Sequence, residues 1–229
     1  MTNRIKQIAL VFMLGFLTTA CGTWNQPKSQ TTEELISKAV RTLDEFHANP
    51  ELEKFNGELL NAHAVVILPT VIKAGFFAGG EGGNGVLLKR QSTNSWGYPT
   101  FLSMGAASFG LQIGLQDTSI ILIARNAGAL EALLKHQGKI GADAGATLWT
   151  EGIGLEAAVT SNLGADLVAF ANSSAGGYVG ASLEGAVLIT RHDLNEAFYG
   201  EGAEPRSIVA GQYQNPKADI LRRALAKNQ

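Results

Sequence analysis

The sequence predicts an α+β fold: a mostly antiparallel, glycine-rich β-sheet or partial barrel with helices at the N- and C-terminal ends. Two observations predict it. Apolar residues recur at helical spacing in residues 35–60 and again in 220–225. Between these regions, short apolar runs alternate with glycine, and most of the 27 glycines fall between Gly75 and Gly185. A chain of this length is sufficient for one substantial core or two small ones.

The N-terminal helices are predicted from start signals. Thr31-x-x-Glu34 has the spacing of a capping box, and the apolar pattern after it continues to about His47. Asn49-Pro50 then begins a second helix, because proline is tolerated at the first helical position. We expect its buried face to be Leu52, Phe55, Leu59 and Leu60.

The glycine-rich region predicts strands and hairpins. Buried or half-buried strands are expected at 65–68, 86–88, 119–124 and 167–171, with a helix over 126–136 between strands. Residues 77–90 and 178–191 resemble each other at a constant offset, which supports two hairpins with tips at 81–84 and 182–185. Gly80-x-Gly82-x-x-Gly85 matches a dinucleotide-binding pattern. We interpret it as a hairpin instead, because a strand-like segment rather than a helix follows it.

The C-terminal region predicts two helices. Thr190-x-x-Asp193 caps a short helix that Gly200 ends, since glycine favours the left-handed conformation after a helix. Asn215-Pro216 opens a last helix that runs through Lys227.

The first 30 residues have the organisation of a bacterial lipoprotein precursor. Arg4 and Lys6 precede a short apolar run, and small residues lead directly into Cys21, the only cysteine. We expect residues 1–20 to be a signal peptide, Cys21 to be the lipid-attachment residue, 21–30 to be a tether and 31–229 to be a single domain. An ordinary cleaved signal that leaves a free thiol is the alternative. Cys21 resembles the lipidated cysteine of the bacterial lipobox. In that family an Asp after the cysteine retains the protein in the inner membrane, so the resemblance, with Gly22 in that place, implies the periplasmic side of the outer membrane.

Charge and residue spacing argue against several functions. The chain has 18 basic and 20 acidic residues, so it lacks the basic excess that binds nucleic acid. The four histidines are scattered, with no pair at metal-ligand spacing, and no cofactor is indicated. No nucleophile elbow occurs. The embedded acids could in principle pair as acid and base, but we expect them on solvated faces; they are Asp143, Glu151, Glu156, Asp166 and Glu184.

One stretch carries an unusual charge pattern. Residues 59–116 contain one acid, Glu81, and three cations, Lys73, Lys89 and Arg90. If the first hairpin brings these cations together beside Phe76 and Phe77, they form a site for an anionic headgroup and its acyl boundary. Ordinary strand-end charges and core aromatics are the competing interpretation.

An ordered series of motifs resembles the SYLF domain. It begins with Pro69-x-x-x-Lys73-Ala-Gly-Phe76 and Gly79-Gly-x-Gly82-x-x-Gly85, and ends with Asn195-x-x-Phe198-Tyr-Gly200. Between them lie Trp96-x-x-Pro99-x-Phe101 and Ser108-Phe-Gly-Leu-Gln112-x-Gly114. The resemblance covers roughly residues 31–213. A Gly-Pro-Gly-like turn expected near residue 152 is replaced by Gly152-Ile-Gly154.

The resemblance implies binding rather than catalysis. Eukaryotic members bind phosphoinositides, and some bind actin; the part that transfers to an envelope lipoprotein is recognition of anionic phospholipid. The residues expected to bind it are Lys73, Phe76, Phe77, Lys89 and Arg90. Some members use an amphipathic helix before the domain, but Glu33, Glu34, Asp44 and Glu45 make the first helix here a poor partner for anionic lipid. A scaffold for other envelope proteins, or an enzyme with an unrecognised site, are the alternatives.

Overall fold

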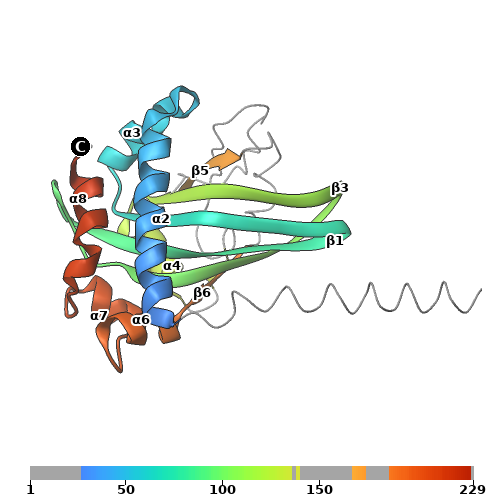
Figure 1. Ribbon diagram of the computed structural model, residues 1–229. Coiled ribbons are helices and arrows are strands. Elements are labelled where there is room, and N and C mark those ends of the chain that lie inside the picture. The colour runs from blue at the N-terminus through green and yellow to red at the C-terminus, as the bar shows by residue number, and fades with distance from the viewer. Residues whose placement is uncertain (1–26, 136–137, 140–166, 174–185, 228–229) are drawn as a thin grey trace, which may run out of the picture.

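A computed structural model describes residues 27–135, 138–139, 167–173 and 186–227. The elements form a mixed α+β fold in which helices pack on a mostly antiparallel sheet (Figure 1). The helices are α2 (Lys28–Ala48), α3 (Glu53–Leu60), α4 (Ala127–Leu133), α6 (His192–Tyr199), α7 (Pro205–Val209) and α8 (Asp219–Lys227), with 3₁₀ turns η2 (Pro50–Leu52) and η3 (Pro216–Ala218). The strands are β1 (Ala64–Ser92), β2 (Ser95–Trp96), β3 (Thr100–Ala124), β4 (Gly138–Lys139), β5 (Leu167–Ser173) and β6 (Val187–Thr190). The predicted fold class is confirmed, as a sheet that is not closed within the described residues.

The long strands β1 and β3 pair along nearly their whole length and both turn back on themselves. Ala64 pairs with Ala124 at one end of the register, and Leu87 pairs with Thr100 at the other. The two halves of β1 also meet, because the Arg90 amide donates to the His63 carbonyl at 2.9 Å. Figure 1 shows both strands running out to the same end and returning, with β1 enclosed by β3. We call this turned end of β1 and β3 the distal end.

Two glycines allow the halves of β1 to approach. A Cβ on Gly83 would lie 2.2 Å from the Thr70 carbonyl oxygen, and one on Gly85 would lie 2.6 Å from that of Ile67. These distances are too short for any side chain, so glycine is required where the backbones approach. The predicted hairpin tip at 81–84 is therefore wrong: these residues lie inside the returning half of β1, and the turn is at Phe76 and Phe77.

Each face of the sheet packs into its own apolar cluster. One face packs against α2, α3, α6 and α8 through Val65, Ile67, Val86 and Leu88. Alternate residues, among them Val66, Leu68 and Leu87, form a second cluster that includes α4. Burial on both faces explains why the strands are continuous apolar runs and not alternating ones.

The helix boundaries correct two start signals. Helix α2 begins at Lys28, three residues before Thr31 and inside the expected tether, and it has no side-chain cap. Its apolar stripe, and not the capping box, determines where it lies. Helix α6 begins after Arg191, so Thr190 is not its cap, although Gly200 ends it as predicted with φ +107°. Asn126 caps α4, and Asn215 caps the last helical segment. Helix α7 was not predicted.

The predicted hairpin tip at 182–185 and the embedded acids Asp143, Glu151, Glu156, Asp166 and Glu184 lie outside the described residues. In the described part of the chain, no helix combines the length and the apolar character needed to cross a bilayer.

Candidate functional site

The distal end holds three of the five residues expected to bind lipid. Phe76 and Phe77 lie at the turn of β1, and Lys73 lies three residues before it. Lys73 is half-buried and forms no ion pair with any described residue. The nearest acid in sequence on the returning half, Glu81, has one carboxylate oxygen that is buried without a hydrogen-bond partner among the described residues. Among the described residues, the base of the distal end therefore carries Lys73, which has no described ion-pair partner, and two acids: Glu81 and the exposed Asp117, which pairs with Ile72.

The turn of β3 adds a second apolar segment to the same end. Phe77 pairs with Gly110, and Gly75 pairs with Gly114. Between these two pairs β1 contributes only Phe76, whereas β3 contributes Leu111, Gln112 and Ile113. Neither turn carries a charge: no Asp, Glu, Lys or Arg occurs between Lys73 and Glu81, or between Arg90 and Asp117. Sequence reasoning missed this second segment because it lies 30 residues or more from Phe76 along the chain. The absence of charged residues from both segments was the signal that could have linked them.

Lys89 and Arg90 lie at the opposite end of β1, so the expected cation cluster does not form. Arg90 lies beside His63, at the start of β1. Lys73 is about nine residues further along the strand, which is roughly 30 Å. The structure thus groups Lys73 with Phe76 and Phe77 and separates all three from Lys89 and Arg90.

Arg90 is engaged in holding the fold together. Its guanidinium donates to the carbonyls of Leu59, Ala62 and Thr93 at 2.5, 2.6 and 2.7 Å. It also lies over the Trp96 ring, 4.4 Å from the centroid. Burial lowers the pKa of Arg90. Leu59 lies in the last turn of α3, and its carbonyl also accepts from the Ala62 amide at 3.2 Å. Arg90 adds a charged donor at this helix end and so joins α3 to the sheet.

A polar network that the sequence did not indicate lies between the sheet and α6. Arg191 forms a bidentate pair with Asp193 at 2.8 and 2.9 Å and donates to Asn84 on β1 at 2.9 Å. Ser103 donates to Asn84 at 2.6 Å, and Lys28 lies 3.6 Å from Asp193. The Arg191 guanidinium holds the pKa of Asp193 at about 2. Because every charge in this network has a partner, its role is to lock α6 and the start of α2 onto the sheet.

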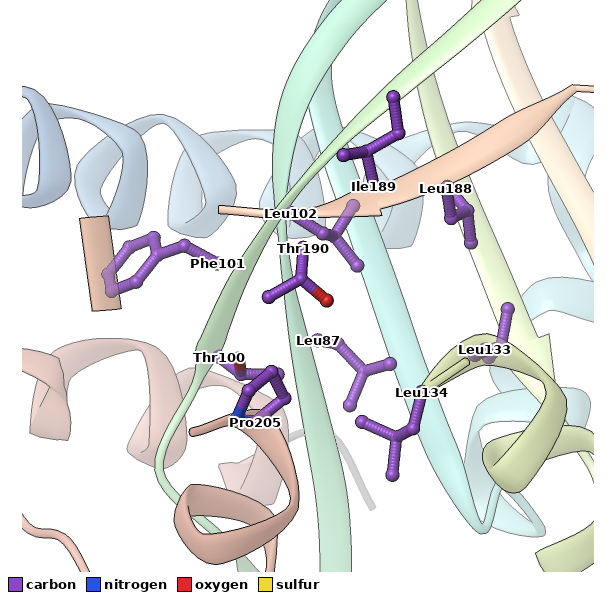
Figure 2. Close-up of a pocket in the computed structure, with 10 residues that line it drawn as sticks. All are labelled: Leu87, Thr100, Phe101, Leu102, Leu133, Leu134, Leu188, Ile189, Thr190 and Pro205. Carbon is purple, nitrogen blue, oxygen red and sulfur yellow. The ribbon is translucent and has the colours of Figure 1, made fainter. Parts of the chain in front are cut away.

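The described residues show no catalytic centre or metal site. A hollow lies where β1, β3, β6, α4 and α7 meet, and Figure 2 shows the residues that line it. Its empty volume, including the open mouth, is about 240 Å³. Its lining is apolar except for Thr100 and Thr190, so it supplies no acid–base pair. No group of three or more His, Cys, Asp or Glu side chains in the described ranges could hold a metal ion.

The first helix has the acidic surface that the sequence indicated. Glu33 pairs with Lys217 of η3 at 2.6 Å, and Glu34 pairs with Lys38 at 2.7 Å. Its apolar stripe is buried against the sheet through Leu35, Ile36, Ala39, Leu43 and Phe46. A helix buried in this way has no free apolar face to lay on a membrane.

Comparison with known proteins identifies the family. A family model described as "Ysc84: Las17-binding protein actin regulator" matches residues 105–228, more than half of the chain. The chain belongs to the Ysc84 family. This confirms the resemblance to the SYLF domain.

Relatives in the Ysc84 family include yeast and mammalian proteins. "LAS seventeen-binding protein 3" of Saccharomyces cerevisiae is 30% identical over 208 residues, 88% of this chain and 45% of the relative. "Protein YSC84" of the same organism is 30% identical over 211 residues, 88% of this chain and 44% of the relative. "SH3 domain-containing YSC84-like protein 1" of Homo sapiens is 27% identical over 200 residues, 84% of this chain and 57% of the relative. The chain thus spans about half the length of the curated relatives it matches.

Proposed function

We propose that this chain is a non-catalytic lipid-binding protein of the cell envelope. Cys21 carries the lipid that attaches it to the periplasmic side of the outer membrane, and the domain recognises anionic phospholipid through the distal end. The observation that carries the proposal is the grouping of Lys73 with Phe76 and Phe77 at an end of the sheet whose turns contain no charge. Apolar side chains flanked by a cation suit the boundary between headgroups and acyl chains.

Electrostatics favours Lys73 as the contact to the headgroup. A cation near an anionic membrane surface contributes about 1 kcal/mol. Lys73 has no described ion-pair partner that would compete with a phosphate. Arg90 is already bonded to three carbonyls. Lys89 lies at the other end of β1, so it serves as a control of the same type on the same strand.

The test is vesicle co-sedimentation of the Cys21→Ser protein, which lacks the lipid. We expect binding to vesicles of phosphatidylcholine with phosphatidylglycerol, and much weaker binding to phosphatidylcholine alone. Lys73→Ala should lower the affinity about fivefold, the equivalent of about 1 kcal/mol, whereas Lys89→Ala should leave it unchanged. Salt should weaken binding, since exposed charges are screened within about 8 Å at physiological ionic strength. Equal loss in both variants would reject the distal end as the site.

Protein binding is the second candidate function, and the names of the relatives favour it. The yeast relative is named as a protein that binds LAS seventeen, and the family is described as an actin regulator. For this chain the corresponding role is a scaffold that docks other envelope proteins. Failure to bind vesicles of any composition would favour this candidate over lipid binding.

A further inference from the structure

We infer that the turn of β3, Phe109–Leu115, enters the acyl region of the bilayer together with the turn of β1. This deepens the proposed function, on which it rests, by naming a second membrane-contacting segment and the part of the lipid that it meets. The segment carries Phe109, Leu111, Ile113 and Leu115 and no charge.

The register places the β3 turn around the β1 turn. Phe109 pairs with Ala78, and Leu115 pairs with Ala74, so the β3 turn extends from one side of Phe76 and Phe77 to the other. Leu111, Gln112 and Ile113 lie between the last two paired positions. A membrane that meets Phe76 and Phe77 at the end of the sheet therefore also meets the β3 turn.

The amino-acid composition of the two turns points to a lipid bilayer as the binding partner of the distal end. The strand segments nearest the helices contain the cations Lys89 and Arg90 and several polar side chains. Residues 74–80 and 108–115, which include the two turns, contain only apolar residues, glycine, Ser108 and Gln112. Lys73, Glu81 and Asp117 flank the two turns and mark where charge resumes. Lys73 pairs with Gln116, next to Asp117, and Glu81 lies on the returning half of β1. An apolar segment with charge beginning at one level matches a bilayer, in which the apolar core changes to headgroups within a few ångströms.

Backbone pairing makes this insertion feasible. In lipid, unpaired N–H and C=O groups are costly, so only segments with satisfied backbones enter. The two turns are paired to each other from Ala74–Leu115 through Gly75–Gly114 and again from Phe77–Gly110 onward. Insertion then carries into the lipid only a few residues that lie outside the register, Phe76 on β1 and Leu111, Gln112 and Ile113 on β3.

The test uses the fact that Cys21 is the only cysteine. In the Cys21→Ser protein, single cysteines at Leu111, Gln112 and Ile113 are labelled in turn with the fluorophore NBD. Three adjacent positions are used because successive residues of a strand point to opposite faces. Thr93→Cys, exposed at the opposite end of β1, is the control. Vesicles contain phosphatidylglycerol, with and without a quencher on the acyl chain.

We expect at least one label in the β3 turn to gain fluorescence several-fold on adding vesicles and to be quenched from the acyl chain, while the Thr93 label changes little. Leu111→Ser with Ile113→Ser should lower vesicle affinity by about tenfold or more, given the cost of leaving apolar surface in water. Labels that remain water-exposed on protein that sediments with vesicles would overturn the inference and leave the proposed function standing. So would labels already shielded without vesicles and unchanged by them. Loss of sedimentation by the unlabelled protein would instead reject the proposed function itself.

Discussion

At the scale of single residues, two arginines join helices to the sheet, a role that their positions in the sequence did not indicate. Arg90 and Arg191 end the two segments that resemble each other at a constant offset. Arg90 pairs with Trp96 of β2, whereas the Arg191 amide donates to the Phe101 carbonyl on β3. Arg90 bonds to backbone carbonyls around the end of α3, whereas Arg191 bonds to Asp193 and Asn84. Equivalent positions thus join different helices to the sheet. Neither guanidinium is free for a ligand.

Replacing Arg90 should therefore affect stability and not lipid binding. We expect Arg90→Ala to lower the free energy of unfolding by about 2 kcal/mol, because three carbonyls lose a charged donor. Lys89→Ala, its neighbour in sequence, should change that free energy by less than about 0.5 kcal/mol. Urea denaturation followed by circular dichroism measures both. Unchanged stability in Arg90→Ala, with weaker vesicle binding, would return Arg90 to the lipid site.

Asp193 predicts a pH dependence in the acid range. Arg191 lowers the pKa of Asp193 from 3.8 to about 2 in the folded protein. The Asp193 carboxylate therefore stays ionised to a lower pH in the folded protein than in the unfolded protein. Its ionisation stabilises the fold, and this contribution is fully present only above the unfolded pKa. It should be lost as the pH falls from about 4 to about 2. Asp193→Asn should lower Tm at neutral pH, and its difference from the wild type should shrink over that range. A constant difference down to pH 2 would contradict the assignment.

At the scale of elements, the return of β1 depends on glycine at close approaches. Gly83 leaves no room for a Cβ, whereas Gly105 on β3 has nothing within 4 Å of the position that a Cβ would take. Both lie in extended backbone on adjacent strands, and Met104, the partner of Gly83, precedes Gly105. Comparing an alanine at Gly83 with an alanine at Gly105 therefore separates the effect of limited space for a Cβ on stability from the effect of replacing a glycine in a strand.

Gly83→Ala should destabilise the fold by about 3 kcal/mol, because the new methyl group meets the Thr70 backbone, which cannot move aside cheaply. Gly105→Ala should be neutral or slightly stabilising, since alanine reduces the entropy of the unfolded chain. Thermal unfolding of the two variants measures the contrast. If Gly83→Ala is tolerated as well as Gly105→Ala, the two halves of β1 do not approach as described.

At the scale of the whole molecule, the described domain has distinct ends. The helices lie at one end of the sheet, and the paired turns of β1 and β3 extend away from them (Figure 1). Lys89 and Arg90 belong to the helix-covered end, and Lys73 belongs to the distal end. The proposed lipid binding by the distal end would leave the helical end available for other contacts.

The proposed anchor makes a prediction at the same scale. In cells given a labelled fatty acid, the wild-type protein should take up label and Cys21→Ala should not, because Cys21 supplies the only thiol. Cys21→Ala should still be exported, since residues 1–20 are unchanged. A wild-type protein without label would mean that the signal is followed by a free thiol and that any membrane contact depends on the domain alone.

The sequence by itself determined the class of elements, because local chemistry decides them. Apolar spacing placed α2, α3 and α8, and Asn126, Gly200 and Asn215 marked helix ends. The apolar runs at 65–68, 86–88, 119–124 and 167–171 all lie in strands. The ordered glycine motifs indicated the family that the comparison then confirmed.

Only the tertiary structure decided where β1 turns and which cations lie together. The turn is at Phe76 and Phe77, and not at the glycines and polar residues of 81–84, because pairing with β3 and the close approach at Gly83 and Gly85 override local turn preference. That shift moves Lys73 to one end of the sheet and Lys89 to the other. It also brings Phe109–Leu115 beside Phe76, a contact between distant segments that no local pattern encodes. Side-chain spacing along a strand is local, whereas the distance between two strand ends depends on every pairing between them.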